Sequence, residues 1–264
     1  MIRKAIKLAL HTLGYDIVKR NNTVQPGSLS QKTAQLKTPP DFESEHIAIL
    51  KTVIPYTVTS PERIYSLIES VRYVLHNDIK GSFLECGVYK GGSMMTIALV
   101  LLQEGVTDRD LYLLDTFEGM PLPEERDVDL WGKPAMNEFS KNRISDASST
   151  WANASLEDVK QAMASTGYPM EKVHFVKGLV ENTLPDKAPD AIALLRLDTD
   201  WYQSTMHELV HLYPRLSPQG VLIVDDYGHF KGAREAVDEY FQENNLAPFL
   251  HRVDYTARLI LKAS

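Results

Sequence analysis

The sequence predicts an α/β fold with a doubly wound, mainly parallel sheet that closes with an antiparallel C-terminal strand. Segments of strand and helix character alternate along most of the chain, which is typical of a parallel sheet covered by helices. Several predicted strands are almost continuously apolar, as expected when both faces of a sheet are buried. The connection between the last two strands, residues 255–257, is too short for a parallel crossover.

The first predicted element is a helix that begins at Pro61, is capped by Thr59 or Ser60, and continues with apolar residues at helical spacing to Asn77. Strands are predicted at Phe83–Val88, Leu111–Phe117, Val173–Lys177, Ile192–Asp198, Gly220–Asp226, Phe249–Asp254 and Arg258–Lys262. Further helices are predicted at Ser93–Gln103, Leu156–Thr166, Thr205–Leu216 and Ala233–Asn244. The last two strands should form an antiparallel hairpin, and a mainly parallel sheet that ends in this way is the pattern of the Rossmann-like class I methyltransferases.

The chain is predicted to comprise a basic amphipathic segment plus linker at residues 1–40 and one domain at residues 41–264. The apolar run in residues 1–20 is too short to cross a membrane, and it lacks the small-residue cleavage site of a signal peptide. A docking helix or frayed terminus is the simpler interpretation, and peripheral contact with an anionic membrane surface is the alternative. Residues 21–40 are polar without an apolar period, which indicates a linker.

One stretch interrupts the alternation of strands and helices. Residues 121–150 are long and polar, with scattered aromatic side chains. Loops of this length are usually functional lids or disordered segments, and this one follows a strand end, where sheets of this type bind ligands. We therefore interpret it as a lid over a binding site rather than as a spacer.

Composition excludes several classes of protein. A chain of 264 residues with 44% hydrophobic residues can bury the core of one large domain. The net charge of -7 disfavours a nucleic-acid binder, which needs a clustered excess of Lys and Arg. The single cysteine, Cys86, allows neither an intramolecular disulfide nor a zinc site built from thiolates. A reducing, cytoplasmic location is the default expectation.

A glycine-rich turn follows the first predicted strand, in the segment Phe83–Ser93. Gly87 permits close backbone approach, and Gly91 and Gly92 expose amide groups at the start of a helix, which suits a carboxylate or phosphate. The spacing is not GxGxxG, so a dinucleotide fingerprint is weak. The amino-acid end of S-adenosylmethionine (SAM) fits better than a pyrophosphate.

The second strand ends with an acidic residue, Asp115, beside the predicted glycine turn. An acid at this position can accept hydrogen bonds from both hydroxyls of a ribose. The alternative is an ordinary capping or turn residue, but the preceding glycine turn favours the ligand interpretation.

Paired acids end two further strands. Asp198 and Asp200 follow one, Asp225 and Asp226 end the other, and parallel neighbours lie about 4.8 Å apart. Asp198, Asp225 and Asp226 should therefore meet, and a hard divalent cation would remove their mutual repulsion, which favours Mg²⁺ over zinc. A metal-bound hydroxyl is easier to ionise, and Asp200 is the candidate base for its proton. A helix-capping role for Asp200 is the alternative.

Residues 207–211 match the HExxH pattern of zinc proteases. We set this interpretation aside because the segment is a helix between parallel strands, and Leu209 and Val210 are typical packing residues. His229 either contacts substrate or anchors its loop. Trp131, Phe139 and Trp151 either line the lid or anchor it.

The sequence resembles the macrocin O-methyltransferase family of the TylF/MycF type, which modifies deoxysugars of antibiotics. The motifs that carry this resemblance are TVTSPERIYSL, FLECGVYKGGS, LDTFEGMP, LRLDTD, LYPRLSPQG and VDDYGHFKGAREAVDEY, and they span nearly the whole domain. The lid and the basic N-terminal segment depart from the shared pattern, so the identity of the sugar is left open.

The resemblance implies a SAM- and Mg²⁺-dependent O-methyltransferase that acts on a sugar-like hydroxyl and forms a homo-oligomer. It implies metal ligands at Asp198, Asp225 and Asp226 and a general base at Asp200. It implies SAM contacts from Thr57, Glu85, Cys86, Gly87, Val88, Tyr89, Ser93, Asp115, Thr116 and Phe117. The alternatives are a SAM-binding or scaffold protein that has lost turnover, which the intact acids disfavour, and a nucleotide-dependent oxidoreductase, which the missing GxGxxG disfavours.

Overall fold

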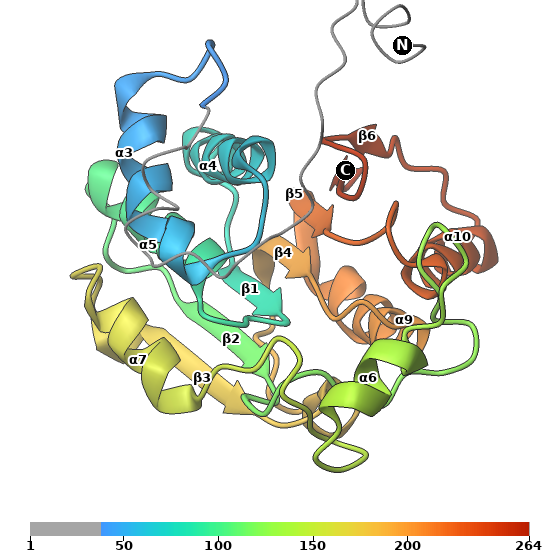
Figure 1. Ribbon diagram of the computed structural model, residues 1–264. Helices are drawn as coiled ribbons and strands as arrows, with labels where there is room; N and C mark the ends of the chain where they lie inside the picture. Colours follow the sequence, from blue (N-terminus) through green and yellow to red (C-terminus); the bar gives the residue numbers. More distant parts are fainter. Residues whose placement is uncertain (1–37, 264) are drawn as a thin grey trace, which may run out of the picture. The chain divides into compact units, whose positions relative to one another are not determined.

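The computed structural model describes residues 38–263, which form a seven-stranded sheet in the order β3-β2-β1-β4-β5-β7-β6 (Figure 1). Strands β1 to β5 are parallel, and β7 is antiparallel to both β5 and β6. The strands are β1 Ser82–Cys86, β2 Leu111–Asp115, β3 Val173–Lys177, β4 Ile192–Leu197, β5 Leu216–Val224, β6 His251–Arg252 and β7 Arg258–Leu261. The predicted fold class, including the closing antiparallel hairpin, is confirmed.

Helices cover both faces of this sheet. Figure 1 shows α4 and α5 on one side of β1, β4 and β5, with α9 and α10 on the other. The helices are α3 Ser44–Val53, α4 Pro61–His76, α5 Gly92–Gln103, α6 Met136–Asn142, α7 Leu156–Ala164, α8 Val180–Thr183, α9 Tyr202–Leu212 and α10 Lys231–Glu243, with 3₁₀ turns at Ile54–Tyr56, Met170–Lys172 and Tyr213–Arg215. This double cover explains the apolar strands, because β1 and β4 are buried along their whole length.

Local signals in the sequence set several boundaries. The cap of α4 is Ser60, whose Oγ accepts a hydrogen bond from the backbone N–H of Arg63 at 3.2 Å, with Pro61 in the first turn. The sequence analysis did not anticipate α3, which begins with a capping box between Glu43 and His46.

The main strands end sooner than predicted, which matters for the site. β2 and β4 stop at Asp115 and Leu197, and β5 stops at Val224. Leu197 pairs with Val224 in adjacent strands, so the acids that follow them leave the sheet side by side. The predicted strand at 249–254 shrinks to His251–Arg252, because it pairs only with β7 at the sheet edge.

Within residues 38–263, no helix is long and apolar enough to span a bilayer. The predicted basic amphipathic segment at residues 1–20, and nearly all of the linker that follows it, lie outside the described residues.

Candidate active site

A cavity of about 440 Å³ lies at the C-terminal ends of the parallel strands. Each of the strands β1 to β5 contributes a residue to the wall of this cavity, either the last residue of the strand or the one directly after it. These are Gly87, Asp115, Gly178, Asp198 and Asp225. Because the cavity joins the glycine turn to the acidic strand ends, one bound molecule can reach both.

The glycine turn is shaped by a close contact between two strand ends. A Cβ atom at Gly87, where φ is +81°, would lie 2.1 Å from the backbone oxygen of Asp198. Any larger residue would therefore push the end of β1 away from the end of β4. Gly91, with φ +88°, caps α5, and the first N–H groups of a helix have no acceptor within it. Gly91 and Gly92, which were expected to expose their amide groups, are buried and lie outside the cavity lining, so the turn reaches the cavity through Gly87 and Tyr89.

Asp115 holds the glycine turn in place. Its Oδ2 accepts hydrogen bonds from the backbone N–H groups of Val88 at 2.6 Å and Tyr89 at 3.0 Å, and its Oδ1 accepts one from Phe117 at 2.6 Å. Burial raises the pKa of Asp115, and these three hydrogen bonds oppose the shift. The carboxylate therefore links the ends of β1 and β2 and fixes the backbone of the glycine turn.

The residues predicted to bind SAM divide into two groups. Those that line the cavity are Gly87, Tyr89, Asp115 and Thr116. Those outside the lining are Thr57, Glu85, Cys86, Val88, Ser93 and Phe117. Thr57 packs against the start of α5, because a Cβ at Gly92 would lie 2.6 Å from the Cβ of Thr57. Glu85 and Cys86 are fully buried within β1. The role of each in SAM binding stays a prediction.

The sequence analysis missed several residues of the wall. These are Val58, Thr59, Arg63, Gly178, Leu179, Val180, Glu181, Tyr255 and Thr256. Gly178 follows β3 directly, so the rule that identified Gly87 and Asp115 at strand ends would have found it. The sequence carries no comparable signal for Arg63, which lies in the first turn of α4.

Three carboxylates gather at the ends of β4 and β5. One oxygen each from Asp198, Asp200 and Asp226 lies within 4.8 Å of the other two, and this is the only group of metal-ligand type found among residues 38–263. Burial raises the pKa of Asp200 to about 7, and it raises the pKa of Asp198 and Asp226 well above the ordinary value. Carboxyl groups this close to one another repel when they are ionised. A hard divalent cation, which binds oxygen ligands, would stabilise their charged forms.

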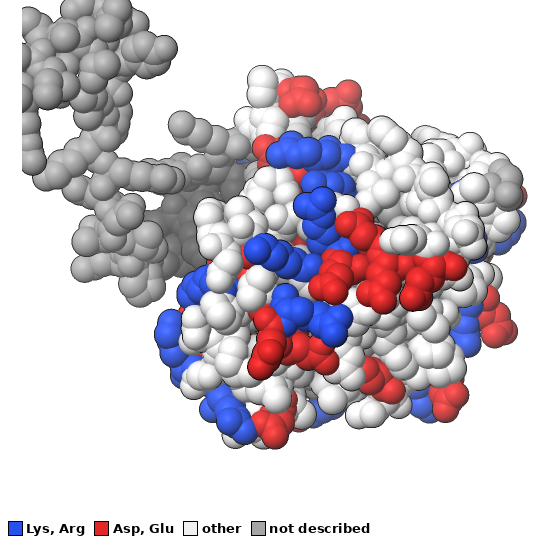
Figure 2. All heavy atoms as spheres, turned by 90° about the vertical axis from the view of Figure 1, so that its right-hand side faces the viewer, with Lys and Arg blue, Asp and Glu red and all other residues white. Residues whose placement is uncertain are grey.

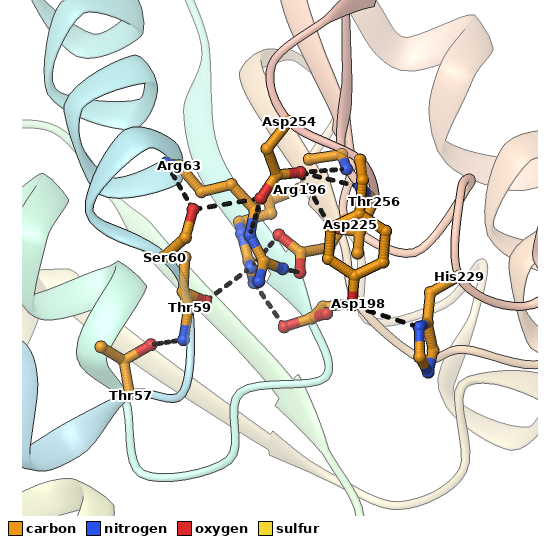
Figure 3. Close-up of polar contacts among 12 residues, drawn as sticks. Thr57, Thr59, Ser60, Arg63, Arg196, Asp198, Asp225, His229, Asp254 and Thr256 are labelled. Atoms are coloured by element: carbon orange, nitrogen blue, oxygen red, sulfur yellow. Dashed lines mark hydrogen bonds and ion pairs between the residues drawn. The ribbon is translucent and has the colours of Figure 1, made fainter. Parts of the chain in front are cut away.

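Asp225 lies beside this cluster in a buried charge network (Figure 3). Its Oδ1 accepts a hydrogen bond from Arg196, and its Oδ2 accepts one from Arg63. Arg196 is only 3% exposed and also donates to Asp198 Oδ2 at 2.7 Å and to Glu85 Oε1. Asp225, one of the three predicted metal ligands, lies outside the group of three carboxylates, in which Asp200 stands instead, and its role in metal binding stays a prediction.

The network continues to the C-terminal hairpin. Arg63 Nε lies 3.1 Å from Asp254 Oδ2, which also accepts a hydrogen bond from Ser60 Oγ at 3.1 Å. Burial raises the pKa of Glu85 at the opposite end to about 7, although Arg196 opposes that shift. The charges alternate in sign along the network, which is the condition under which buried ions are tolerated.

The predicted lid forms part of the cavity wall only at its edges. Met120 and Pro121 at its start and Trp151 just past its end line the cavity, and Trp151 packs against Trp201 with ring centroids 5.6 Å apart. Figure 1 shows the green segment with α6 at the arrowhead ends of β2 and β3. Phe139, in α6, is fully buried and anchors the segment.

The middle of the lid is attached to α9 and α10. The buried Asp127 accepts a hydrogen bond from the backbone N–H of Tyr202 at 2.9 Å and fills the space beside Gly232, where a Cβ would lie 2.0 Å from its Oδ1. Arg126 pairs with Glu235 at 3.6 Å. Figure 2 shows charged side chains of both signs side by side on the face where α10 lies. Exposed pairs of this kind contribute little, so Asp127 is the main anchor.

Aromatic rings surround His229 at the cavity. Its Nδ1, shown in Figure 3, lies 3.4 Å from the hydroxyl of Tyr255. The ring of Trp131 meets the imidazole edge-on, with the two ring centroids 5.8 Å apart. Burial lowers the pKa of His229, which favours the neutral imidazole. Trp131 is 72% exposed, so it is not the lid anchor.

The strand order, the glycine turn and the cavity at the strand ends define a class I methyltransferase fold. Comparison with known proteins identifies the family. The model of the macrocin O-methyltransferase (TylF) family matches residues 18–262, and the chain belongs to this family of O-methyltransferases. The predicted family and enzyme class are confirmed.

Several relatives are similar over most of their length. The chain is 31% identical to demethyldecarbamoylnovobiocin O-methyltransferase of Streptomyces niveus over 199 residues, which cover 75% of this chain and 72% of the relative. It is 32% identical over 203 residues to 8-demethyl-8-(2,3-dimethoxy-alpha-L-rhamnosyl)-tetracenomycin-C 4'-O-methyltransferase of Streptomyces olivaceus, covering 77% and 74% of the two chains. The solved structure of the O-methyltransferase NovP has a TM-score of 0.69 at 29% identity and covers 79% of this chain and 83% of that one.

Proposed function

We propose that this enzyme transfers the methyl group of SAM to a hydroxyl of a sugar or glycoside and that the transfer requires Mg²⁺. The observation that carries the proposal is one cavity that joins the glycine turn after β1 to a cluster of carboxylates. The turn suits the amino-acid end of SAM, and the carboxylates suit a cation.

The cofactor would occupy the side of the cavity next to β1 and β2. The glycine turn would contact its amino-acid end through Gly87 and Tyr89, which line the cavity, and Asp115 would keep the surrounding backbone in the required shape. Tyr89 and Thr116 line the same side of the cavity. The glycine turn, Asp115 and Thr116 would thus all serve the binding of one ligand.

The metal would be held by Asp198, Asp225 and Asp226. Arg196 orients both Asp198 and Asp225, because it donates a hydrogen bond to each. When bound, Mg²⁺ supplies a Lewis acid that favours the ionised form of the acceptor hydroxyl, and SAM supplies the methyl group.

Asp200 would accept the proton of the acceptor hydroxyl. Its side chain lies in the cluster and lines the cavity, which puts its carboxylate within reach of a hydroxyl bound beside the cation. Without a base, a neutral hydroxyl would have to attack the methyl group, and the product would be an oxonium ion that still carries the proton.

A sugar-like acceptor is supported by the relatives and by the cavity. One relative is named for a rhamnosyl group. Trp151, His229 and Tyr255 give the cavity wall aromatic surface beside the carboxylates, and such a mixture suits the apolar faces and polar edges of a sugar ring.

The test is methyl transfer to a panel of glycosides and nucleotide sugars, with labelled SAM and purified protein. We expect transfer that needs Mg²⁺, stops in excess EDTA and returns when Mg²⁺ is restored. Absence of any heat when SAM is titrated into folded protein with Mg²⁺ present would overturn the proposal.

A further inference from the structure

A buried carboxyl group lies beneath the acid cluster. Glu208, in α9, is 0% exposed, and among the described residues no Lys, Arg or His forms an ion pair with it. Its Oε1 and Oε2 lie 3.0 and 3.1 Å from the hydroxyl of Thr199. Burial raises the pKa of Glu208 well above its ordinary value, which favours its neutral form. A fully buried carboxyl group whose side-chain partners are the Thr199 hydroxyl and the Cys86 thiol suits a structural hydrogen bond rather than proton transfer.

The partner of Glu208 occupies a critical position. Thr199 separates Asp198 from Asp200, and it lines the cavity between them. The backbone here is unusual, because Asp200 has φ +68°, a left-handed conformation that costs about 1–2 kcal/mol for a residue other than glycine. Such a conformation persists only where its surroundings fix it.

Several contacts fix the backbone of this turn. The N–H of Asp198 donates to the oxygen of Cys86 at 2.9 Å, and the N–H of Trp201 donates to the oxygen of Thr199 at 2.8 Å. These bonds hold the turn at both ends. The side chain of Thr199 is held only by Glu208 among the described hydrogen bonds. Glu208 therefore fixes the orientation of the Thr199 side chain, between the two aspartates.

This contact also explains the HExxH segment. His207 and His211 lie together, with ring centroids 4.4 Å apart, on the partly exposed side of α9. Glu208 points inward and is engaged with Thr199. The residues of the motif thus lie on two faces of the helix, and the glutamate contacts Thr199 in the wall of the cavity.

We propose that Glu208 is a positioning residue, which acts through Thr199 to hold Asp198 and Asp200 in the geometry that cation binding requires. This inference rests on the proposed function. It assigns to α9 a role that the cavity lining alone does not reveal, because Glu208 touches neither the cavity nor the acid cluster.

The test measures cation affinity without any acceptor substrate. Mn²⁺, which prefers the same oxygen ligands as Mg²⁺, is titrated into the full chain and followed by electron paramagnetic resonance. Thr199→Val removes the hydroxyl at nearly constant volume, and Glu208→Leu removes the carboxyl. Loss of a residue that orients metal ligands typically weakens metal binding about 10- to 100-fold, and we expect this for each variant. The double variant should bind no more weakly than either single one.

Two controls separate positioning from general stability. Glu208→Gln keeps a carbonyl acceptor for Thr199, so it should bind Mn²⁺ within about threefold of the wild type. Ser70→Ala removes another buried hydroxyl, which donates to the oxygen of Ser66 at 2.7 Å in α4, and should leave Mn²⁺ affinity unchanged. If Glu208→Leu does not fold, Thr199→Val carries the test. Unchanged Mn²⁺ affinity in folded Thr199→Val overturns the inference, whereas absence of Mn²⁺ binding by the wild type overturns the proposed metal site itself.

Discussion

Replacement of Asp200 by Asn tests the proposed general base. Asn is nearly the same size, and it tolerates the left-handed backbone at this position, where φ is +68°. The change therefore removes basicity with little strain. Alanine would add a backbone penalty and confuse the two effects.

The expected loss follows from the role. Removing a general base lowers kcat about 10²- to 10⁴-fold, and this corresponds to about 3–5 kcal/mol of transition-state stabilisation. The stability effect has the opposite sign in the metal-free protein. Burial raises the pKa of Asp200 to about 7, so the stability this carboxyl contributes at low pH is lost as pH rises through 7. Asp200→Asn should therefore melt higher than the wild type above that pH.

The assay compares kcat, SAM affinity and Mn²⁺ affinity in one variant. Asp78→Asn is the matched control, because Asp78 also has a positive φ, +53°, but is exposed at the end of α4. Near-normal kcat in Asp200→Asn would refute the base and return Asp200 to a helix-capping role. A fall in Mn²⁺ affinity of more than about 100-fold would instead make Asp200 a metal ligand, because removal of a residue outside the ligand set costs no more than about 10- to 100-fold.

Three further predictions concern the metal and the cofactor turn. Asp198→Ala or Asp225→Ala should abolish Mg²⁺-stimulated turnover while sparing SAM binding by calorimetry, and full activity in excess EDTA would remove the metal from the mechanism. Mg²⁺ should raise the melting temperature more at about pH 8 than at about pH 5.5, because the raised pKa values of Asp198 and Asp200 leave the cluster protonated in acid; equal shifts would contradict a carboxylate site. Asp115→Ala leaves three buried N–H groups without their acceptor and should cost about 2–4 kcal/mol of unfolding free energy, with SAM affinity at least tenfold lower in a calorimetric titration and Mn²⁺ affinity nearly unchanged.

The ends of the parallel strands are predictable from this sequence to within about two residues, because apolar runs stop abruptly at glycine or acid. Leu197 pairs with Val224, and this register places Asp198 and Asp225 at one edge of the sheet, as their spacing predicts. Gly87 is equally clear, since its close contact with Asp198 allows no side chain. Periodicity and strand ends thus identify the fold and the acids of the site.

The charge network around these acids could not be predicted from the sequence. Arg63 and Asp225 are 162 positions apart, and no local pattern indicates that they meet. The left-handed backbone of Asp200 and the inward direction of Glu208 depend on the packing of α9, which the sequence pattern describes only as a helix with one apolar face. Pairings between distant polar side chains require the assembled tertiary structure.

The hydrogen bond between Ser60 and Asp254 spans 194 positions of the chain, and it joins the start of α4 to the C-terminal hairpin. During synthesis the helix that carries Arg63 is complete long before the hairpin that carries Asp254 leaves the ribosome. Contacts of such long range form late and slow the folding of a domain. Until then Arg63 lacks one of its two carboxylate partners. The buried charge network of the site is therefore complete only after Asp254 has been synthesised and has reached Arg63.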